Sequence, residues 1–534
     1  MKIATISIFI CICFLSVCLA ADNGLTLYVD PSSTSIDPKC GGSIDNACTT
    51  MPKAYSSYLA QTDGTNTTQL TLQLMDGVYN ASVNGVNVMT DNIYLTSLVV
   101  SSYSNNSANV ILTDSKGMLP FFYYKQQGNV AQNLGVINVT FTNSVSIVSS
   151  NSMVSVGFIN CVFTNASSIY SPLLSLLVNI GPNAQAPSLN FGNCTISGIT
   201  LDHSLNVIET QNYTVFVDGL SIDQLSANSA FSIRNGFVTM VRLSMTNSFG
   251  AQSPLLLYQC GLSMRSCTFN NNRGNWGGAI KMNSDGNSYD ATITTSSFTN
   301  NISPNQGGAL FISGGNIQLT QSTFVSNSAY GPGGMGGAVY ISSPRFTIDQ
   351  GIFTNNTAKN QGGSLFLSFC GNAYFSGTQF NDNSAPEGGA IYTSGSTVTF
   401  NTDSFSNNTA AYHGDQVYCL SSNFSISSIY NTATNRTAYY CPNQDCSFSS
   451  SSFKCPPAEP SSSSSDNTHS TSHSDNPKND DHKKIVIAVC VSIAGVALIA
   501  AVSFIIYRRH HHHHHRHRHH HHDHHETKSL IYQN

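Results

Sequence analysis

Residues 298–310 read FTNNISPNQGGAL, and residues 353–365 read FTNNTAKNQGGSL. Each stretch opens on a phenylalanine, has an asparagine three residues later, and ends with a glycine pair, a small residue and an aliphatic residue. The unit recurs with 25 to 29 residues between successive phenylalanines, which are Phe269, Phe298, Phe324, Phe353, Phe380 and Phe405. A fixed period in this range is typical of a solenoid, because each repeat forms one coil that stacks on the coil before it.

The residues between these motifs predict β-strands. Residues 317–320 (IQLT) and 397–400 (TVTF) alternate in polarity, as half-buried strands do. Glycine pairs and asparagine runs separate such stretches and favour turns. Parallel strands that return once per coil would lie about 4.8 Å apart. We therefore expect phenylalanine to stack on phenylalanine inside and asparagine on asparagine at a turn, with the glycine pair permitting positive φ and close approach.

Less regular coils precede these repeats. Residues 137–143 (INVTFTN) and 159–165 (INCVFTN) share one pattern 22 residues apart, and residues 188–198 are similar. The predicted solenoid therefore begins well before Phe269.

The start of the chain resembles a known entry into this kind of fold. Residues 27–31 (LYVDP) through 72–79 (LQLMDGVY) resemble the N-terminal entry of pectin-lyase-like parallel β-helices. We therefore assign residues 22–69 to an N-terminal entry or cap and residues 70–418 to the solenoid.

The repeat of residues 267–415 resembles that of the chlamydial polymorphic outer membrane proteins, in which Gly-Gly-Ala-[Ile/Leu/Val] and Phe-x-x-Asn motifs alternate. The resemblance implies an all-β fold, a right-handed parallel β-helix solenoid, and a surface or adhesin role. The chain departs from that family at its C-terminus, which has an apolar segment where those proteins have an outer-membrane barrel. Only the repeat-bearing part therefore carries over, and its motif residues are expected to build the coil.

Two apolar segments indicate how the chain meets a membrane. Residues 1–21 predict a signal peptide, with Lys2, an apolar run and a small-residue cleavage site; a first membrane helix is the alternative, disfavoured by the run's shortness. Residues 485–507 contain no charge and are long enough to cross a hydrocarbon core of about 30 Å as a single transmembrane helix. This order predicts a single-pass type I protein of the plasma membrane with its N-terminus outside.

The segments beside the predicted membrane helix are of low complexity. Residues 456–484 are rich in Ser and Asn and predict a disordered stalk. Residues 508–534 form a His-rich cytoplasmic tail, in which imidazoles at this density can bind zinc, copper or nickel; the alternative is a low-complexity expansion without selected function. The candidate metal ligands are His510, His511, His512, His513, His514 and His515. No resident cofactor is expected.

Export to an oxidising compartment predicts disulfides. Eleven cysteines would lie outside the membrane, so at least one thiol would be unpaired or would pair between chains. Cys40 with Cys48 and Cys260 with Cys267 are the expected local bridges, and residues 419–455 are expected to form a Cys-rich C-terminal cap.

Asn-x-Ser/Thr sequons are frequent on the exported side, although an Asn-rich chain also produces them by chance. Asn301 is the sequon we exclude, because Pro304 follows it closely. Glycosylation is predicted at Asn66, Asn80, Asn105, Asn138, Asn165, Asn193, Asn212, Asn355, Asn407, Asn423 and Asn435.

Catalytic chemistry has one candidate location. The residues just before the glycine pairs form a column, which is Trp276, Gln306, Met335, Gln361, Glu387 and His413. Glu387 and His413 lie one coil apart and, with Asp415, could form an acid/base group; the alternative is a solvated turn column. Acidic residues are otherwise sparse, whereas glycoside hydrolysis needs two carboxylates across a bond. Trp276, the only tryptophan, is a candidate for stacking on a sugar, or else a buried plug.

Composition narrows the function classes. Only 9% of residues are charged and no basic patch precedes the predicted membrane helix, which excludes nucleic-acid binding. The sequence favours a single-pass cell-surface glycoprotein that acts in adhesion or recognition, with an unidentified extracellular glycan or protein as its ligand. The alternative is a membrane-tethered polysaccharide lyase or hydrolase, so whether the protein is an enzyme stays open.

Overall fold

The computed structural model describes residues 24–62, 69–89, 95–113, 120–125, 132–144, 146–168, 170–180, 185–284, 289–431, 438–442 and 445–449. The predicted signal peptide, stalk, membrane helix and His-rich tail lie outside these residues. Within the described ranges, no helix is both long and apolar enough to span a bilayer.

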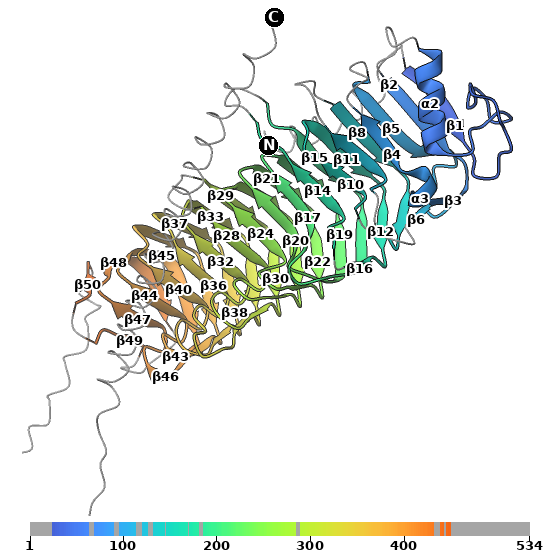
Figure 1. The fold of residues 1–534 in the computed structure, drawn as a ribbon. Coiled ribbons are helices and arrows are strands. Elements are labelled where there is room, and N and C mark those ends of the chain that lie inside the picture. The colour runs from blue at the N-terminus through green and yellow to red at the C-terminus, as the bar shows by residue number, and fades with distance from the viewer. Residues whose placement is uncertain are drawn as a thin grey trace, which may run out of the picture. The chain divides into compact units, whose positions relative to one another are not determined.

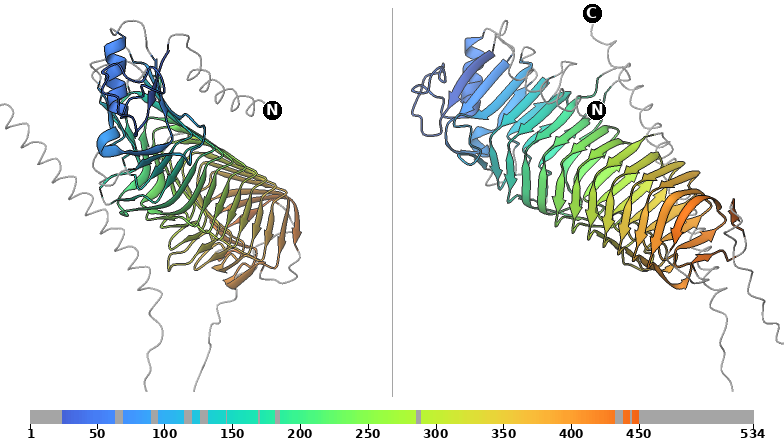
Figure 2. Two further views of the ribbon diagram at one scale, coloured as in Figure 1. Left: turned by 90° about the vertical axis from the view of Figure 1, so that its right-hand side faces the viewer. Right: turned by 180° about the vertical axis from the view of Figure 1, so that it is seen from behind.

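The described chain folds into a parallel β-solenoid (Figure 1, Figure 2). A typical coil has three strands in a 36-stranded sheet, here called sheet A, and one in a 14-stranded sheet, here called sheet B. One such coil consists of β33 (Asn316–Thr320), β34 (Thr323–Val325) and β35 (Ser328–Ala329), followed by β36 (Val339–Ser342) in sheet B. Each strand pairs in parallel with its counterparts one coil away, as predicted from the period.

Sheet B runs as one row of strands along the solenoid (Figure 1). Its strands, in order, are β4 (Val86–Met89), β7 (Phe122–Lys125), β10 (Val148–Ser150), β14 (Leu174–Leu177), β17 (Asn206–Gln211), β20 (Ser229–Arg234), β24 (Leu255–Tyr258), β28 (Ile280–Asn283), β32 (Leu310–Ser313), β36, β40 (Leu365–Ser368), β44 (Ile391–Ser394), β47 (Val417–Leu420) and β49 (Tyr439–Tyr440).

A helix covers the N-terminal end of the solenoid. β1 (Gly24–Val29) pairs in register with β2 (Gln69–Leu74), and α2 (Met51–Gln61) lies between them in the sequence. Thr50 caps α2 by accepting the backbone N–H of Lys53, and the helix buries one face against the first coils. The repeat pattern gave no sign of this helix. The predicted Cys40–Cys48 disulfide is present beside it.

The solenoid interior contains the phenylalanine stack that the repeat predicts. All six motif phenylalanines are buried, and neighbouring ring centroids lie 4.7 to 5.2 Å apart with interplanar angles of 2 to 16°. The strand register places each ring directly on the next, as in the pairing of Phe298 with Phe324. The spacing follows from the backbone, because parallel strands lie about 4.8 Å apart.

An asparagine ladder accompanies this stack, and its side chains are buried. At Asn327, Oδ1 accepts hydrogen bonds from the backbone N–H and the Nδ2 of Asn301, both at 3.0 Å. Its own Nδ2 donates to the Phe298 carbonyl and to Asn356 Oδ1. The same pattern joins Asn272, Asn301, Asn327, Asn356, Asn383 and Asn408. These buried amides are therefore hydrogen-bonded through both their oxygen and their nitrogen, as most buried polar groups in proteins are.

The glycine pairs allow the coils to pack closely. The first glycine of the regular pairs has φ between +65° and +67°, a region that glycine occupies without cost. The second has no room for a side chain: a Cβ on Gly308 would meet the Gly337 carbonyl of the next coil. Both expected roles of the pair are confirmed.

The expected Cys260–Cys267 bridge was wrong. Both residues are buried free thiols, one at each end of β25 (Gly261–Arg265). A strand rises about 3.3 Å per residue, so five strand residues hold these cysteines much farther apart than the ~7 Å that a disulfide tolerates between Cα atoms. Nearness in sequence misled the prediction because an extended segment separates its ends.

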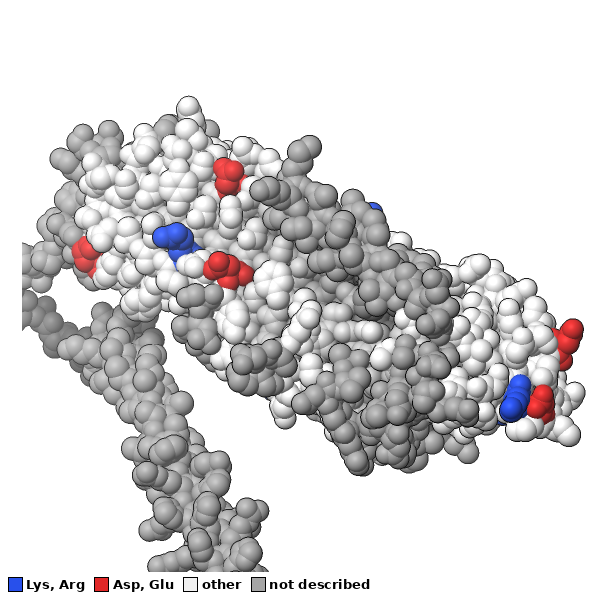
Figure 3. Space-filling model, turned by 90° about the horizontal axis from the view of Figure 1, so that it is seen from above, with Lys and Arg blue, Asp and Glu red and all other residues white. Residues whose placement is uncertain are grey.

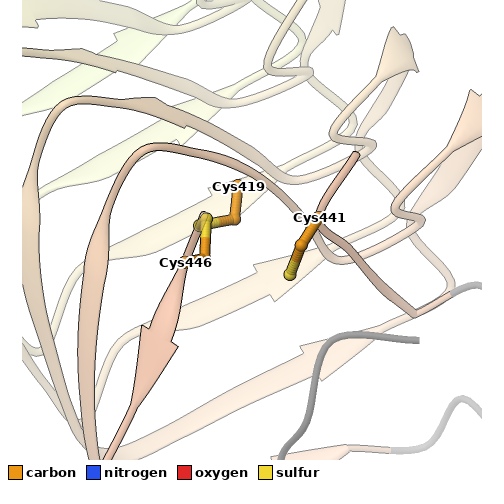
Figure 4. A group of neighbouring side chains, drawn as sticks. All are labelled: Cys419, Cys441 and Cys446. Carbon is orange, nitrogen blue, oxygen red and sulfur yellow. A yellow bond between two sulfur atoms is a disulfide. The ribbon is translucent and has the colours of Figure 1, made fainter. Parts of the chain in front are cut away.

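The predicted Cys-rich cap is present in part. Cys419 of β47 forms a disulfide with Cys446, and the sulfur of Cys441 lies within 4.8 Å of both (Figure 4). Three buried sulfurs in one place would suit a soft metal ion, but two of them are oxidised to a disulfide and do not offer thiolates. The cluster therefore closes the last coil covalently.

Candidate functional site

The outer face of sheet B carries a column of aromatic side chains. In β32 and its neighbours, alternate residues are aliphatic and buried in the interior, so the residues between them point outward. Strand register brings one outward residue per coil into line, giving Phe311, Tyr340, Phe366, Tyr392, Tyr418 and Tyr440. We call these six residues the outer aromatic ladder.

The ladder rings stack along the solenoid outside the main core. Successive centroids from Phe311 to Tyr418 lie 4.7 to 5.2 Å apart at 4 to 12°, and Tyr440 tilts by 46° at the end. Phe366, Tyr392 and Tyr418 are only 5 to 8% exposed and form a hydrophobic cluster of their own. Because neighbours cover the ring faces, the ladder offers a ligand its edges and hydroxyl groups.

The predicted column before the glycine pairs lies beside the ladder. Its backbone pairs from coil to coil, Gln306 with Met335, Met335 with Gln361, and Gln361 with Glu387. Glu387 in β43 (Ser384–Glu387) then pairs with His413 in β46 (Thr409–His413), so these two residues do occupy adjacent coils. We call the column from Trp276 to His413 the shelf.

Shelf and ladder meet through side chains. Gln361 Nε2 donates to Glu387 Oε2 at 2.8 Å, and Met335 packs against the ladder. The pKa of Tyr392 is raised to about 12, first by burial and then by the charge of Glu387, while a hydrogen bond from Gln361 opposes the rise. The Glu387 carboxylate, the Gln361 amide and the ladder hydroxyls therefore form one polar region.

The C-terminal end of the shelf is the most accessible part. The exposed His413 ring stacks on Tyr440, with centroids 3.9 Å apart and an interplanar angle of 8°. Burial raises the pKa of Tyr418, and the charge of Glu387 adds to the rise. Imidazole, carboxylate, amide and phenol groups thus converge within the last three coils of the shelf.

The predicted acid/base group is assembled only in part. Glu387 and His413 are neighbours, but the part of the chain that the structure describes has a single ion pair, Arg242 with Asp218, and no hydrogen bond joins the two. Asp415 Oδ1 accepts the backbone N–H of Ala410 at 2.8 Å and so closes its own turn. A catalytic role for these residues stays a prediction.

Trp276 lies at the N-terminal end of the shelf and is half-buried. Its ring meets Phe311 edge-on at 5.4 Å, and Lys281 Nζ lies 5.7 Å from the indole centroid. That ammonium also donates to Gln252 Oε1 at 3.0 Å, and burial lowers its pKa. Trp276 is therefore engaged by a cation on one side, and its role as a sugar platform remains a prediction.

Repeat spacing contained a signal for the ladder that the sequence analysis missed. From the second motif glycine pair onward, an aromatic residue follows the aliphatic residue after the pair, as in residues 307–311 (GGALF) and 336–340 (GGAVY), whereas Lys281 holds this position after the first pair. The aliphatic residue points inward, so strand alternation sends the aromatic one outward. The predicted metal ligands His510 to His515 lie outside the described residues.

Asp403 is a buried acid of the coil interior. It lies in β45 (Thr397–Ser406), where its carboxylate accepts the backbone N–H of Thr378 at 2.6 Å and that of Asn401 at 2.8 Å. Burial raises the pKa of Asp403 to about 6, and these two hydrogen bonds oppose the rise.

The stability contributed by Asp403 is expected to fall as pH rises. Its folded pKa of about 6 exceeds the unfolded value of about 3.9. The folded chain therefore holds the proton more tightly, and the extra stability is complete below about pH 4 and lost through about pH 6. Two pKa units correspond to about 3 kcal/mol.

An Asp403→Asn variant isolates this effect, because asparagine keeps the size of the side chain but does not titrate, whereas serine would complete a sequon with Asn401 and Thr402. As the pH falls from about 7.5 to about 4.5, the wild type should gain about 2 kcal/mol in unfolding free energy relative to the variant. Chemical unfolding at both pH values measures this difference. A difference that does not change with pH would show that Asp403 keeps an ordinary pKa.

Sequons and the shelf occupy different parts of the surface. Asn301 is buried in the asparagine ladder, which agrees with its exclusion, whereas Asn66 and Asn435 lie outside the described residues. Seven sequon asparagines have φ between 50° and 61°, which marks them as turn residues: Asn105, Asn138, Asn165, Asn193, Asn212, Asn355 and Asn407. Among described residues, no sequon lies on the shelf or on sheet B from β20 to β47.

Comparison with known families recovers the repeat. Residues 266–281, 295–313 and 377–394 match the family model of the Chlamydia polymorphic membrane protein repeat. The chain carries repeats similar to those of the Chlamydia polymorphic membrane proteins. Each matched segment includes one buried motif phenylalanine, one residue of the asparagine ladder and one glycine pair, so the repeat motif corresponds to the stacked interior of the solenoid.

Three solved structures are similar, at low identity. The catalytic domain of Agl-KA matches at 11% identity with a TM-score of 0.34, covering 80% of this chain and 68% of that one. Tailspike protein 3 of bacteriophage CBA120 matches at 11% identity with a TM-score of 0.31, and the match covers 78% of this chain and 61% of that one. The A-module of the mannuronan C-5 epimerase AlgE6 from Azotobacter vinelandii matches at 8% identity with a TM-score of 0.22, and the match covers 71% of this chain and 91% of that one. No curated protein matches the sequence.

Proposed function

We propose that the chain is a single-pass type I glycoprotein of the plasma membrane whose solenoid binds an extracellular ligand in adhesion or recognition. The observation that carries the proposal is the outer face of sheet B, where the ladder and the shelf place polar groups along six coils. Aromatic side chains are unusual on a surface that otherwise consists of small, polar residues. A role in ligand binding would explain why they point outward here.

The distribution of sequons and charges supports this choice of face. Glycans on the turn sequons would leave the shelf uncovered, because none of the sequons lies on it. Charged side chains are few on this protein, and those visible in Figure 3 are scattered over that view. Recognition would therefore depend on hydrogen bonds and shape rather than on long-range electrostatic attraction.

A membrane-tethered polysaccharide lyase or hydrolase is the second candidate. The pairing of Glu387 with His413 favours it, since a carboxylate and an imidazole on adjacent coils are suited to proton transfer. No second carboxylate of the described residues shares the shelf with Glu387, which weakens the case for hydrolysis.

A Glu387→Gln variant tests both candidates. Glutamine already occupies this column at Gln306 and Gln361, so the fold should be retained. For a recognition protein, retention on cells should weaken about tenfold, the value of one charge-assisted hydrogen bond. For an enzyme, oligosaccharide products detected by mass spectrometry should disappear.

An Asp382→Ser variant is the matched control for charge. Asp382 lies at an exposed turn, and Ser326 occupies the equivalent position with the same φ, so the variant loses a carboxylate without strain and without creating a sequon. It should behave as wild type in both assays. Equal retention of the Glu387→Gln variant and wild type, without products from either, would remove the shelf from the proposed function.

A further inference from the structure

The shelf shows three chemical features that bear on the kind of ligand it takes. They are the orientation of the ladder rings, the sign of the charges nearby and the alignment of one shelf position and one ladder position in successive coils. This inference rests on the proposed function, since it concerns the ligand of the same face.

The shelf and the outer aromatic ladder together offer a ligand several kinds of hydrogen-bonding group. Gln361 contributes an amide, Glu387 a carboxylate, Tyr392 and Tyr418 phenols, and His413 an imidazole. Amides, phenols and imidazoles both donate and accept, and a carboxylate accepts strongly. A ligand rich in hydroxyl groups, each a donor and an acceptor, satisfies such a set best.

Charge disfavours an anionic polymer at the end of the shelf that carries Glu387. Lys281 of sheet B lies toward the other end and is already held by Gln252 and the Trp276 ring, and the exposed Lys359 belongs to the turn before Gln361. Glu387 lies close enough to raise the pKa of both Tyr392 and Tyr418, so the local potential is negative. A uronate or sulfated chain would be repelled where the polar groups converge.

The regular spacing indicates a linear ligand. Backbone pairing repeats the shelf position once per coil from Gln306 to His413, and the ladder repeats in step with it. A straight polymer of identical units along the solenoid axis would meet an equivalent position at every coil. Each weak contact would then be reinforced by its neighbours on the same chain.

We propose that the shelf and the outer aromatic ladder bind a linear, uncharged polysaccharide along the solenoid axis, with Gln361, Glu387 and His413 forming the strongest subsite. Gln361 and Glu387 hydrogen-bond the sugar hydroxyls, and His413 borders the last ring. Sugar rings lie against the ladder edges, because the ring faces are already stacked on one another.

Affinity electrophoresis of the purified full chain tests the proposal. The probes are galactomannan and a linear β-glucan as uncharged polymers, polygalacturonate as an anionic one and chitosan as a cationic one. We expect retardation by at least one uncharged polymer, none by polygalacturonate, and little loss of binding at high salt, since salt screens only charged contacts. Glu387→Gln should weaken binding about tenfold and His413→Gln by a similar factor.

Controls separate the site from the fold. Glutamine is native to the column, so both variants should unfold at the wild-type temperature, and Asp382→Ser should bind as wild type. Unchanged binding by Glu387→Gln and His413→Gln would show that the polysaccharide does not bind at this subsite. Retardation by chitosan or polygalacturonate alone would overturn the ligand class.

Retention on cells distinguishes this inference from the proposed function. If no polysaccharide retards the chain while Glu387→Gln still loses retention on cells, the shelf binds another ligand and only this inference fails. If cells do not retain the wild type and no polymer retards it, both proposals fail. Parallel loss of retardation and retention in the same variants supports both.

Discussion

Replacement of Asn327 by alanine is expected to lower the free energy of unfolding of the solenoid by about 4 kcal/mol or more. The substitution removes four hydrogen bonds in a dry interior: two from Asn301, one to the Phe298 carbonyl and one to Asn356. Each partner left behind is buried, so it loses its hydrogen bond without regaining water. Guanidinium unfolding followed by the fluorescence of the single Trp276 measures the loss.

Asn300→Ser is the matched control for this variant. Asn300 is exposed at a turn with φ +55°, and Ser326 occupies the same turn one coil later with the same φ. The control should change the unfolding free energy by no more than about 0.5 kcal/mol. Equal stability of Asn327→Ala and Asn300→Ser would mean that the asparagine ladder contributes no more to the unfolding free energy than an ordinary surface turn does.

Replacement of Gly337 by alanine is expected to cost about 3 kcal/mol or more through steric conflict. A Cβ at this position would meet the carbonyl oxygens of Gly363 and Thr357 in the next coil. Backbone cannot move aside as a flexible side chain does, because both carbonyls are held in the stacked coils. Thermal unfolding followed by circular dichroism measures the effect as a fall in the melting temperature.

Gly333→Ala provides the comparison within the same loop, since a Cβ there would meet nothing within 4 Å. Its melting temperature should match the wild type or exceed it slightly, because alanine restricts the unfolded chain more than glycine does. A Gly337→Ala protein as stable as Gly333→Ala would show that the coils can separate locally, contrary to the close packing described above.

The interior was predictable because it repeats. A 25- to 29-residue period aligns each motif residue with its copy in the next coil, so Phe298 on Phe324 and Asn301 on Asn327 follow from spacing alone. Local pairing of cysteines did not follow in the same way. Cys260 and Cys267 are close in sequence but separated by a full strand, whereas Cys419 and Cys446 are one coil apart and bonded.

The candidate site was predictable as a column but not as a surface. Spacing placed Glu387 one coil before His413, and the backbone pairs them. What the pair touches could not be deduced, since the Gln361 hydrogen bond and the Tyr440 stacking depend on how the shelf turn lies beside sheet B. Asp415 illustrates the limit: it is two residues from His413, yet its carboxylate serves its own turn.

The sequence by itself determined the period of the coil, the strands within it and the residues that stack, because parallel pairing acts on every repeat alike. Tertiary structure alone decided how far each of the other stacked columns is exposed to water. One residue separates Leu310, inside the solenoid, from Phe311 in the outer aromatic ladder. Successive side chains on a strand point to opposite faces, and only the closed coil determines which of those faces is shut away from water.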